Sequence, residues 1–241
     1  MTEAEFTGFR PAALAFLGSL ARHNDRDWFE RHRSTYEGEL RAPLAALAEE
    51  VDVRLATLAP EIVGDPKRSL FRIHRDVRFS ADKSPYKTHV ACWFHHVDAG
   101  RGVGTGTAHG GAGFYFHLEA TRASLGGGIW MPPRPTLEKI RASIDENASR
   151  LTRILADPTV RRRFGGLAEE AMLIRMPRGY AESHPAARLL RHQSYTLGRD
   201  IAPRDLLSAR LPDVLAREYA RLLPLVRWIN HSLGLRTLAR R

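Results

Sequence analysis

The chain has 241 residues, 43% of them apolar, so it can bury a full core without stabilising cross-links. Its single cysteine, Cys92, excludes an intramolecular disulfide and a cage of thiolate metal ligands, and it predicts a reducing, cytoplasmic location. The formal charge of +10 favours anionic partners and disfavours basic ones.

The positive charge is unevenly distributed. Residues 1–60 carry 7 basic and 10 acidic side chains, whereas residues 131–241 carry 21 basic and 11 acidic ones. The basic C-terminal part could attract small anions, acidic lipid or nucleic acid, or its arginines could lie on solvated helix faces. No run of 18 apolar residues occurs, and the N-terminus lacks a basic segment followed by an apolar one, so we expect a soluble, unprocessed protein without a membrane partner.

The first 60 residues predict three helices. Apolar residues at helical spacing between 14 and 20 indicate the first helix. A cap at Asn24 or Asp25 would begin the second, which continues through residue 40. The third has Pro43 in its first turn and ends before Pro60.

The middle of the chain, residues 68–131, changes to a period of two and predicts a sheet. Residues 136–155 are helical in pattern, residues 158–200 are mixed, and residues 205–233 predict one or two helices. We therefore expect an α+β fold. It would be a single domain over residues 1–241, with a mainly antiparallel central sheet between N-terminal and C-terminal helices.

Two predicted strands have one apolar and one ionisable face. In residues 71–79, alternate positions place Phe71, Ile73, Val77 and Phe79 on one side with Arg75, and Arg72, His74, Asp76 and Arg78 on the other. From residue 114 onward, phenylalanine and leucine alternate with Tyr115, His117, Glu119 and Thr121. The polar sides would combine into a basic, histidine-containing concavity, or they would simply face water.

The segment SADKSP, residues 80–85, predicts a turn that projects Lys83 and Lys87 beside the arginines. Only four of the 37 basic residues are lysine, and two of them lie here. At these positions the compact ammonium of lysine would serve better than the planar guanidinium of arginine. Residues 72–87 hold three arginines and two lysines against Asp76 and Asp82 alone. That excess suits a phosphate or carboxylate.

Other motifs are less specific. The glycine-rich residues 100–113 lack the ending of a phosphate-binding loop and predict a hairpin loop. Gly126, Gly127 and Gly128 predict either close backbone approach or a ligand-facing turn. Eleven histidines show no spaced metal motif, so no metal site and no cofactor is assigned, and Cys92 in an apolar run predicts an inert core thiol.

The chain also resembles a known family. The segments at residues 16–37, 71–89, 126–132 and 179–195, in this order, resemble family 2461 of domains of unknown function, a group of conserved hypothetical proteins of bacteria and fungi. The resemblance supplies no activity, substrate or cofactor. It implies as landmarks Arg72, Arg75, Asp76, Arg78, Phe79, Asp82, Lys83, Pro85, Tyr86, Lys87, Gly126, Gly127, Gly128, Trp130, Arg141 and Arg191. His192 stands where the family carries a lysine.

These observations favour a pocket for a small anionic molecule that bears a phosphate or carboxylate, with enzyme activity left open. Its ligand-binding residues would be Arg72, Arg75, Arg78, Asp82, Lys83, Tyr86, Lys87, Gly127, Gly128, Trp130, Arg141 and Arg191, and its catalytic candidates His74, Asp76, His117 and Glu119. The alternatives are nucleic-acid binding by the basic C-terminal half and a purely structural ion-pair network.

Overall fold

The computed structural model describes residues 5–78, 80–99 and 110–238. A five-stranded antiparallel sheet lies at its centre, with strands in the order β1-β2-β3-β4-β5. The strands are β1 (Ile62–Val63), β2 (His89–His96), β3 (Gly113–Glu119), β4 (Ala123–Ile129) and β5 (Tyr195–Asp200). Together with the helices around this sheet, the strand order confirms the predicted α+β class.

The N-terminal helices follow the predicted signals closely. They are α1 (Pro11–Arg22), α2 (Arg26–Arg31), α3 (Arg33–Tyr36), the π-helical turn η1 (Glu37–Arg41) and α4 (Ala42–Leu58). Asp25 caps α2 by accepting a hydrogen bond from the Trp28 amide at 2.8 Å. The predicted break before Pro43 is wrong, because α3, η1 and α4 follow one another directly. Pro43 sits in the first turn of α4, directly after the π-helical turn η1.

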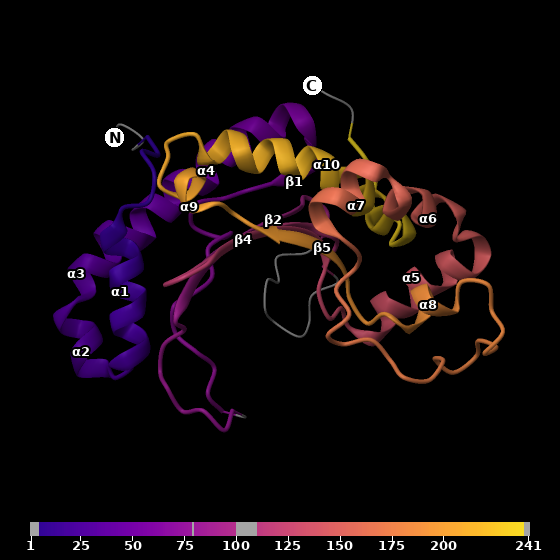
Figure 1. Ribbon diagram of the computed structural model, residues 1–241, viewed down its shortest axis with the longest axis horizontal. Coiled ribbons are helices and arrows are strands. Elements are labelled where there is room, and N and C mark those ends of the chain that lie inside the picture. Colours follow the sequence, from indigo (N-terminus) through magenta and orange to yellow (C-terminus); the bar gives the residue numbers. More distant parts are fainter. Residues whose placement is uncertain (1–4, 79, 100–109, 239–241) are drawn as a thin grey trace.

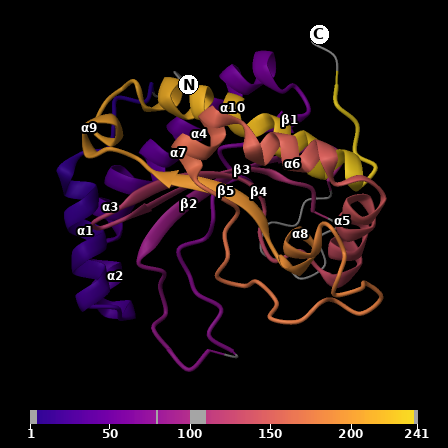
Figure 2. The same ribbon diagram turned by 45° about the vertical axis from the view of Figure 1, so that its right-hand side comes forward.

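The C-terminal helices are α5 (Arg134–Asn147), α6 (Ser149–Ala156), α7 (Pro158–Phe164), α8 (Ala187–Arg191), α9 (Pro203–Leu206) and α10 (Leu211–Ser232). Helices α4 and α10 lie side by side across one face of the sheet, as Figures 1 and 2 show. Helices α1 to α3 stand beyond one end of the sheet, and α5 and α8 stand near the other.

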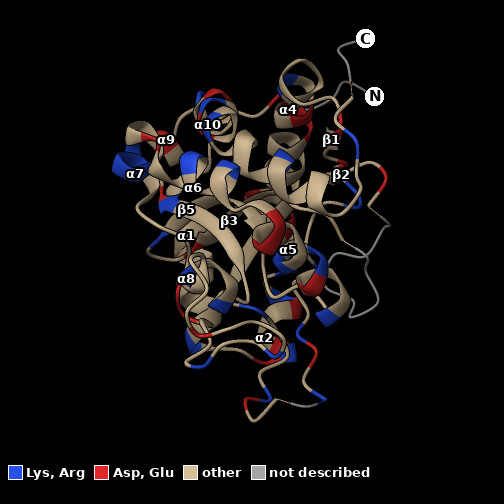
Figure 3. Ribbon diagram, turned by 90° about the vertical axis from the view of Figure 1, so that its right-hand side faces the viewer, with Lys and Arg blue, Asp and Glu red and all other residues tan. Residues whose placement is uncertain are grey.

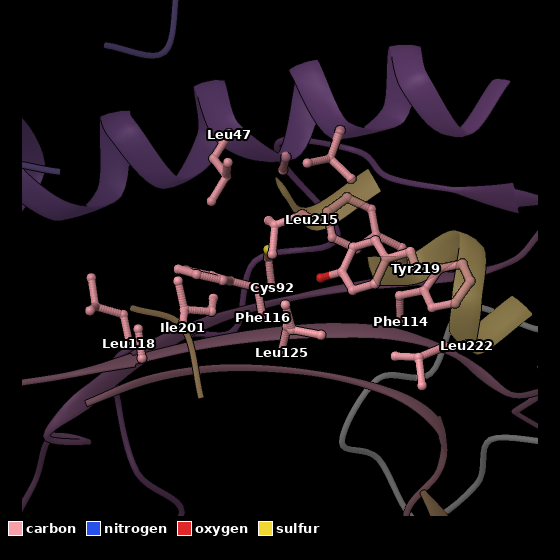
Figure 4. Close-up of a cluster of buried hydrophobic side chains, with 14 of the residues drawn as sticks. Leu47, Cys92, Phe114, Phe116, Leu118, Leu125, Ile201, Leu215, Tyr219 and Leu222 are labelled. Atoms are coloured by element: carbon pink, nitrogen blue, oxygen red, sulfur yellow. The ribbon is translucent and has the colours of Figure 1, made fainter. Parts of the chain in front are cut away.

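The core lies between the sheet and the two covering helices. Phe114 and Phe116 of β3 and Leu125 of β4 point toward Leu215 and Tyr219 of α10 (Figure 4), and all five side chains are buried. The Tyr219 ring stacks on the Phe114 ring with 4.5 Å between centroids, and its hydroxyl donates to the Tyr115 carbonyl at 3.1 Å. The apolar half of the predicted alternation therefore faces α10.

The predicted strand over residues 71–79 is wrong for its described part, residues 71–78. These residues form an irregular excursion. An isolated bridge joins Leu70 to Cys92 of the sheet, and a second one joins His74 to Tyr86 within the excursion. Beyond Arg75, side-chain acceptors take part instead, because Asp76 accepts from the Arg78 amide at 3.2 Å and Asp82 from the Ser84 amide at 2.9 Å. Side-chain exposure still alternates: positions 72, 74, 76 and 78 are more exposed than their neighbours.

Candidate functional site

The candidate site lies on the face of the sheet opposite α4 and α10. Strand pairing places His89 opposite Glu119 and Trp93 opposite Tyr115, with His117 between the two β3 residues on the same face. Successive side chains in a strand point to opposite faces, so these five residues share the polar face. The sequence thus places an aromatic, imidazole and carboxylate set on adjacent strands.

Three of these side chains form a hydrogen-bonded chain along β3. The Tyr115 hydroxyl lies 3.0 Å from His117 Nδ1, and His117 Nε2 lies 2.7 Å from a Glu119 carboxylate oxygen. A carboxylate only accepts, so the arrangement assigns the imidazole proton to Nε2, which donates to Glu119. Nδ1 then accepts from the tyrosine hydroxyl. Because tyrosine, imidazole and carboxylate follow one another, a proton can move along these hydrogen bonds.

Burial sets the protonation of the neighbouring groups. It lowers the pKa of His89 to about 4, with a further contribution from His117, whose ring centroid lies 4.4 Å away. It also raises the pKa of Tyr115 to about 12. Near neutral pH, His89 is therefore an uncharged donor and acceptor, and Tyr115 keeps its proton.

Lys87 and Arg72 bring positive charge to the edge of this face. Burial, and then the charge of Arg72, lower the pKa of Lys87. The Lys87 Nζ lies 5.3 Å from the centroid of the Phe71 ring, which meets the Tyr115 ring edge-on at 5.8 Å. Among the residues that the structure describes, no carboxylate forms an ion pair with Lys87 or Arg72.

The other charges of the predicted turn are largely partnered inside it. Arg75 pairs with Asp82, Arg78 pairs with Asp76 at 2.7 Å, and Lys83 donates to the Val77 carbonyl at 2.9 Å.

The partners also determine the basicity of the two aspartates. The hydrogen bonds of Arg78 lower the pKa of Asp76 to about 2, and those of Ser84 and then Arg75 lower that of Asp82 to about 2. Asp76 is therefore a weak base, and in the described chain Arg72, Lys83 and Lys87 are the cations of this segment that no carboxylate pairs with.

Tyr86 anchors the turn. Its side chain is 2% exposed and stacks on Phe29 of α2 at 4.1 Å between centroids. The Asn24 side chain donates to the Tyr86 carbonyl at 2.9 Å and accepts from its amide at 3.0 Å. His74 is exposed beside the Tyr86 ring, at 5.1 Å between centroids.

The remaining predicted residues gather at the other end of β4, where Ile129 pairs with Tyr195, whereas Ala123 pairs with Leu118 near the Glu119 end. There Arg141 is buried and donates to the carbonyls of Leu190 at 2.9 Å and His192 at 3.2 Å. Trp130 is 54% exposed. Arg191 pairs with Glu182 at 3.0 Å, while its buried Nε has no acceptor among the described residues. The structure does not bring this group together with Lys87.

Gly127 and Gly128 are packing positions. A Cβ on Gly127 would lie 3.1 Å from the Leu222 Cβ of α10, so this residue allows close approach of strand and helix. Gly128 has φ +131°, and a Cβ there would lie 2.0 Å from the Tyr195 carbonyl oxygen. Close backbone approach, one of the two predicted roles of the glycine run, is present.

Sequence reasoning left Tyr115, His89 and Trp93 out of the candidate site. The period of two already placed Tyr115 beside His117, but neither His89 nor Trp93 lies in a predicted two-faced strand. The Trp93 indole nitrogen is buried and has no acceptor among the described residues, so it is a free donor on this face. The described chain contains no group of three or more metal-ligating side chains. The predicted glycine-rich loop at residues 100–113 lies mostly outside the described residues.

The sequence matches one family over residues 12–228, described as conserved hypothetical protein (DUF2461). No curated protein matches the chain. No solved structure matches it. Among the described residues, no helix is both long enough and apolar enough to cross a membrane.

Proposed function

The chain belongs to the DUF2461 family of conserved hypothetical proteins, and we propose that it binds a small anionic molecule beside the Tyr115–His117–Glu119 chain. One observation carries this proposal: Lys87 and Arg72, which have no carboxylate partner among the described residues, lie near the hydrogen-bonded Tyr115–His117–Glu119 chain. The ligand would bear a carboxylate or a phosphate. The protein would remain in the cytoplasm, as its single cysteine suggests.

Lys87 and Arg72 support the anionic character of the ligand. Their charges lie close enough for Arg72 to lower the pKa of Lys87, which is unfavourable unless an anion is shared between them. A phosphate or carboxylate would offset the repulsion between the two positive charges. The guanidinium of Arg72 would supply two parallel donors, and the ammonium of Lys87 would supply a compact charge. The indole N–H of Trp93 offers a further neutral donor on the same face.

The hydrogen-bonded chain supports acid–base chemistry on the bound anion. In the proposed step, the Tyr115 oxygen accepts a proton from the substrate while the phenolic proton passes to His117 Nδ1. The resulting imidazolium is held by Glu119 at 2.7 Å, as a carboxylate stabilises a catalytic histidine. The substrate loses one proton and the imidazole gains one. The reaction class is proton abstraction from an anionic substrate.

Binding is tested by thermal shift with a panel of carboxylates and phosphate monoesters that carry no long hydrocarbon chain. Lys87→Gln and Arg72→Gln should fold normally and lose roughly tenfold or more in affinity for every compound of this panel that stabilises the wild type. Lys139→Gln is the matched control, because Lys139 is an exposed lysine on α5. If the Lys87 and Arg72 variants keep all ligand-induced shifts, the assignment is wrong.

The catalytic part is tested separately on any compound that binds. Tyr115→Phe should leave affinity within about twofold and abolish exchange of the substrate proton with deuterated solvent, because it removes only the reacting hydroxyl. If Tyr115→Phe still exchanged the substrate proton with solvent, the proposed proton abstraction by Tyr115 would be wrong. The protein would then be a binding protein without this chemistry.

A further inference from the structure

We propose a second ligand site, in the cavity between α6, α7 and α10, for an organic anion with an apolar body. The cavity has a volume of about 510 Å³ and lies among residues of these three helices. That volume falls within the range of small-molecule sites, roughly 300 to 1,000 Å³. It is separate from the polar face of the sheet, since α10 lies across the opposite face.

Three arginines give the cavity its charge. Arg150 and Arg153 of α6 and Arg221 of α10 contribute to its wall. In the described chain, Arg150 and Arg153 have no ion pair, whereas Arg221 donates to Glu218 at 3.4 Å and to the Arg217 carbonyl at 2.9 Å. Figure 3 shows basic segments on both α6 and α7. Two guanidiniums are thus available to bind an anion.

The single acid in the wall does not neutralise these arginines. Asp157 directs its carboxylate to the start of α7, where it accepts from the amides of Thr159 at 2.8 Å and Val160 at 3.0 Å. It therefore serves as a helix cap. The wall keeps a net positive charge, which an anionic head group would complement.

The remaining wall decides the nature of the ligand. Ile154, Val160 and Pro224 supply apolar surface, and Pro224 lies inside α10, where its ring is exposed. None of the described residues that line the cavity is aromatic. Bases of single-stranded nucleic acid bind by stacking on aromatic side chains, which this wall does not provide. A carboxylate or phosphate joined to a hydrocarbon chain matches both halves of the wall.

Calorimetry on the full chain tests this proposal with octyl phosphate, inorganic phosphate and octanol as probes. Octyl phosphate should bind at least about tenfold more tightly than either partial probe, because only it uses both the charged and the apolar wall. Equal binding of inorganic phosphate would show that the apolar wall plays no part. Failure of octyl phosphate to bind would overturn the site.

Paired variants assign the binding to this cavity. Arg150→Gln with Arg153→Gln should weaken octyl phosphate about tenfold or more. Arg161→Gln with Arg162→Gln removes the same charge from exposed positions of α7 outside the cavity wall, and should change affinity less than about twofold. Equal losses in both pairs would mean diffuse charge attraction, and retained affinity in the first pair would place the ligand elsewhere.

Two further measurements separate this site from the one on the sheet and from nucleic acid. Lys87→Gln should bind octyl phosphate as the wild type does, and loss of binding would assign the probe to the sheet site. The methyl resonance of Ile154, assigned with Ile154→Val, should shift on titration with octyl phosphate. An unshifted Ile154 signal would overturn the proposal. So would displacement of octyl phosphate by a single-stranded oligonucleotide, if both double arginine variants also lost affinity for octyl phosphate.

Discussion

His89 is partly buried on the polar face in its neutral form, which links the stability of the protein to pH. Its pKa is about 4 in the folded chain, compared with an ordinary value near 6.5. Between these two values the unfolded chain binds more protons than the folded chain. Stability should therefore be fully present above about pH 6.5 and decrease as the pH falls through this window. Burial also lowers the pKa of His95 and His192, so they add to the same trend.

Urea unfolding at a series of pH values from 4 to 7 measures this linkage. His89→Gln should reduce the dependence of the unfolding free energy on pH by up to about 1.4 kcal/mol per pH unit, the limit for one proton. His231→Gln is the control, because the His231 side chain is exposed near the end of α10. An unchanged pH dependence in His89→Gln would show that His89 does not titrate differently in the two states.

At the residue scale, alternation was the informative signal. The period of two placed His117 and Glu119 on one face, and the structure joins them by a hydrogen bond. The partners of Arg75 and Arg78 could not be predicted in the same way. Asp82 and Asp76 reach them through the geometry of an irregular turn, and a strand pattern contains no information about such a turn.

Among elements, the excursion over residues 70–88 is held to the N-terminal helices by Asn24. Its side chain makes two hydrogen bonds to the Tyr86 backbone, as a neighbouring strand would. Asn24→Ala leaves a partly buried amide and carbonyl unpaired, so we expect a loss of about 1 to 3 kcal/mol in unfolding free energy. Hydrogen exchange should also accelerate at the Lys87 amide, which bonds Ile73. Asn147→Ala is the control, since within the described chain the Asn147 side chain bonds only Ser149, two residues further along.

The ion pairs of the turn should contribute little to stability. Asp76 and Arg78 are two residues apart and both exposed, so their pair joins no separate elements. Asp76→Ala should leave the midpoint of urea unfolding unchanged within error. A sharp loss of stability would instead support the structural network as the role of this segment.

Glu218 is a buried ionic group that does join elements. It is 2% exposed and pairs with Arg163 of α7, Arg199 of β5 and Arg221 of α10. Burial opposes its ionisation, but hydrogen bonds from Arg163 and Arg199 outweigh burial and lower its pKa. Glu218→Gln should cost about 2 to 3 kcal/mol of unfolding free energy, since the partly exposed guanidiniums regain some hydration. Glu138→Gln, which breaks an exposed pair on α5, should have no measurable effect.

The strands show where element prediction from sequence reached its limit. β2, β3 and β4 lie inside the predicted sheet region, but β5 lies in a segment with a mixed pattern. Its sequence YTLGRD contains a glycine and ends in two charged residues, so it lacks strong strand propensity. Pairing with β4 and packing of Leu197 in the core stabilise it instead. Such support comes from tertiary contacts and is not visible in a short sequence window.

At the scale of the whole molecule, the excess positive charge belongs largely to the C-terminal half, while its buried carboxylates are already paired. An oligonucleotide should bind weakly at low salt and lose that binding between about 50 and 200 mM salt, as expected for counterion release. A mobility-shift series against salt checks this expectation. Tight binding that persists near physiological salt would favour nucleic acid as the partner over a small anion.

The position of β5 in the chain has a consequence for synthesis. Residues 130–194 must leave the ribosome before β5 can pair with β4, so the β4 edge is the last strand edge to gain its partner in the sheet. An open edge invites pairing with other nascent chains. Three successive glycines give β4 a low tendency to be extended and offer no side chains to such a partner. The same run that allows close packing in the finished fold thus offers little side-chain surface to a second chain while the sheet is incomplete.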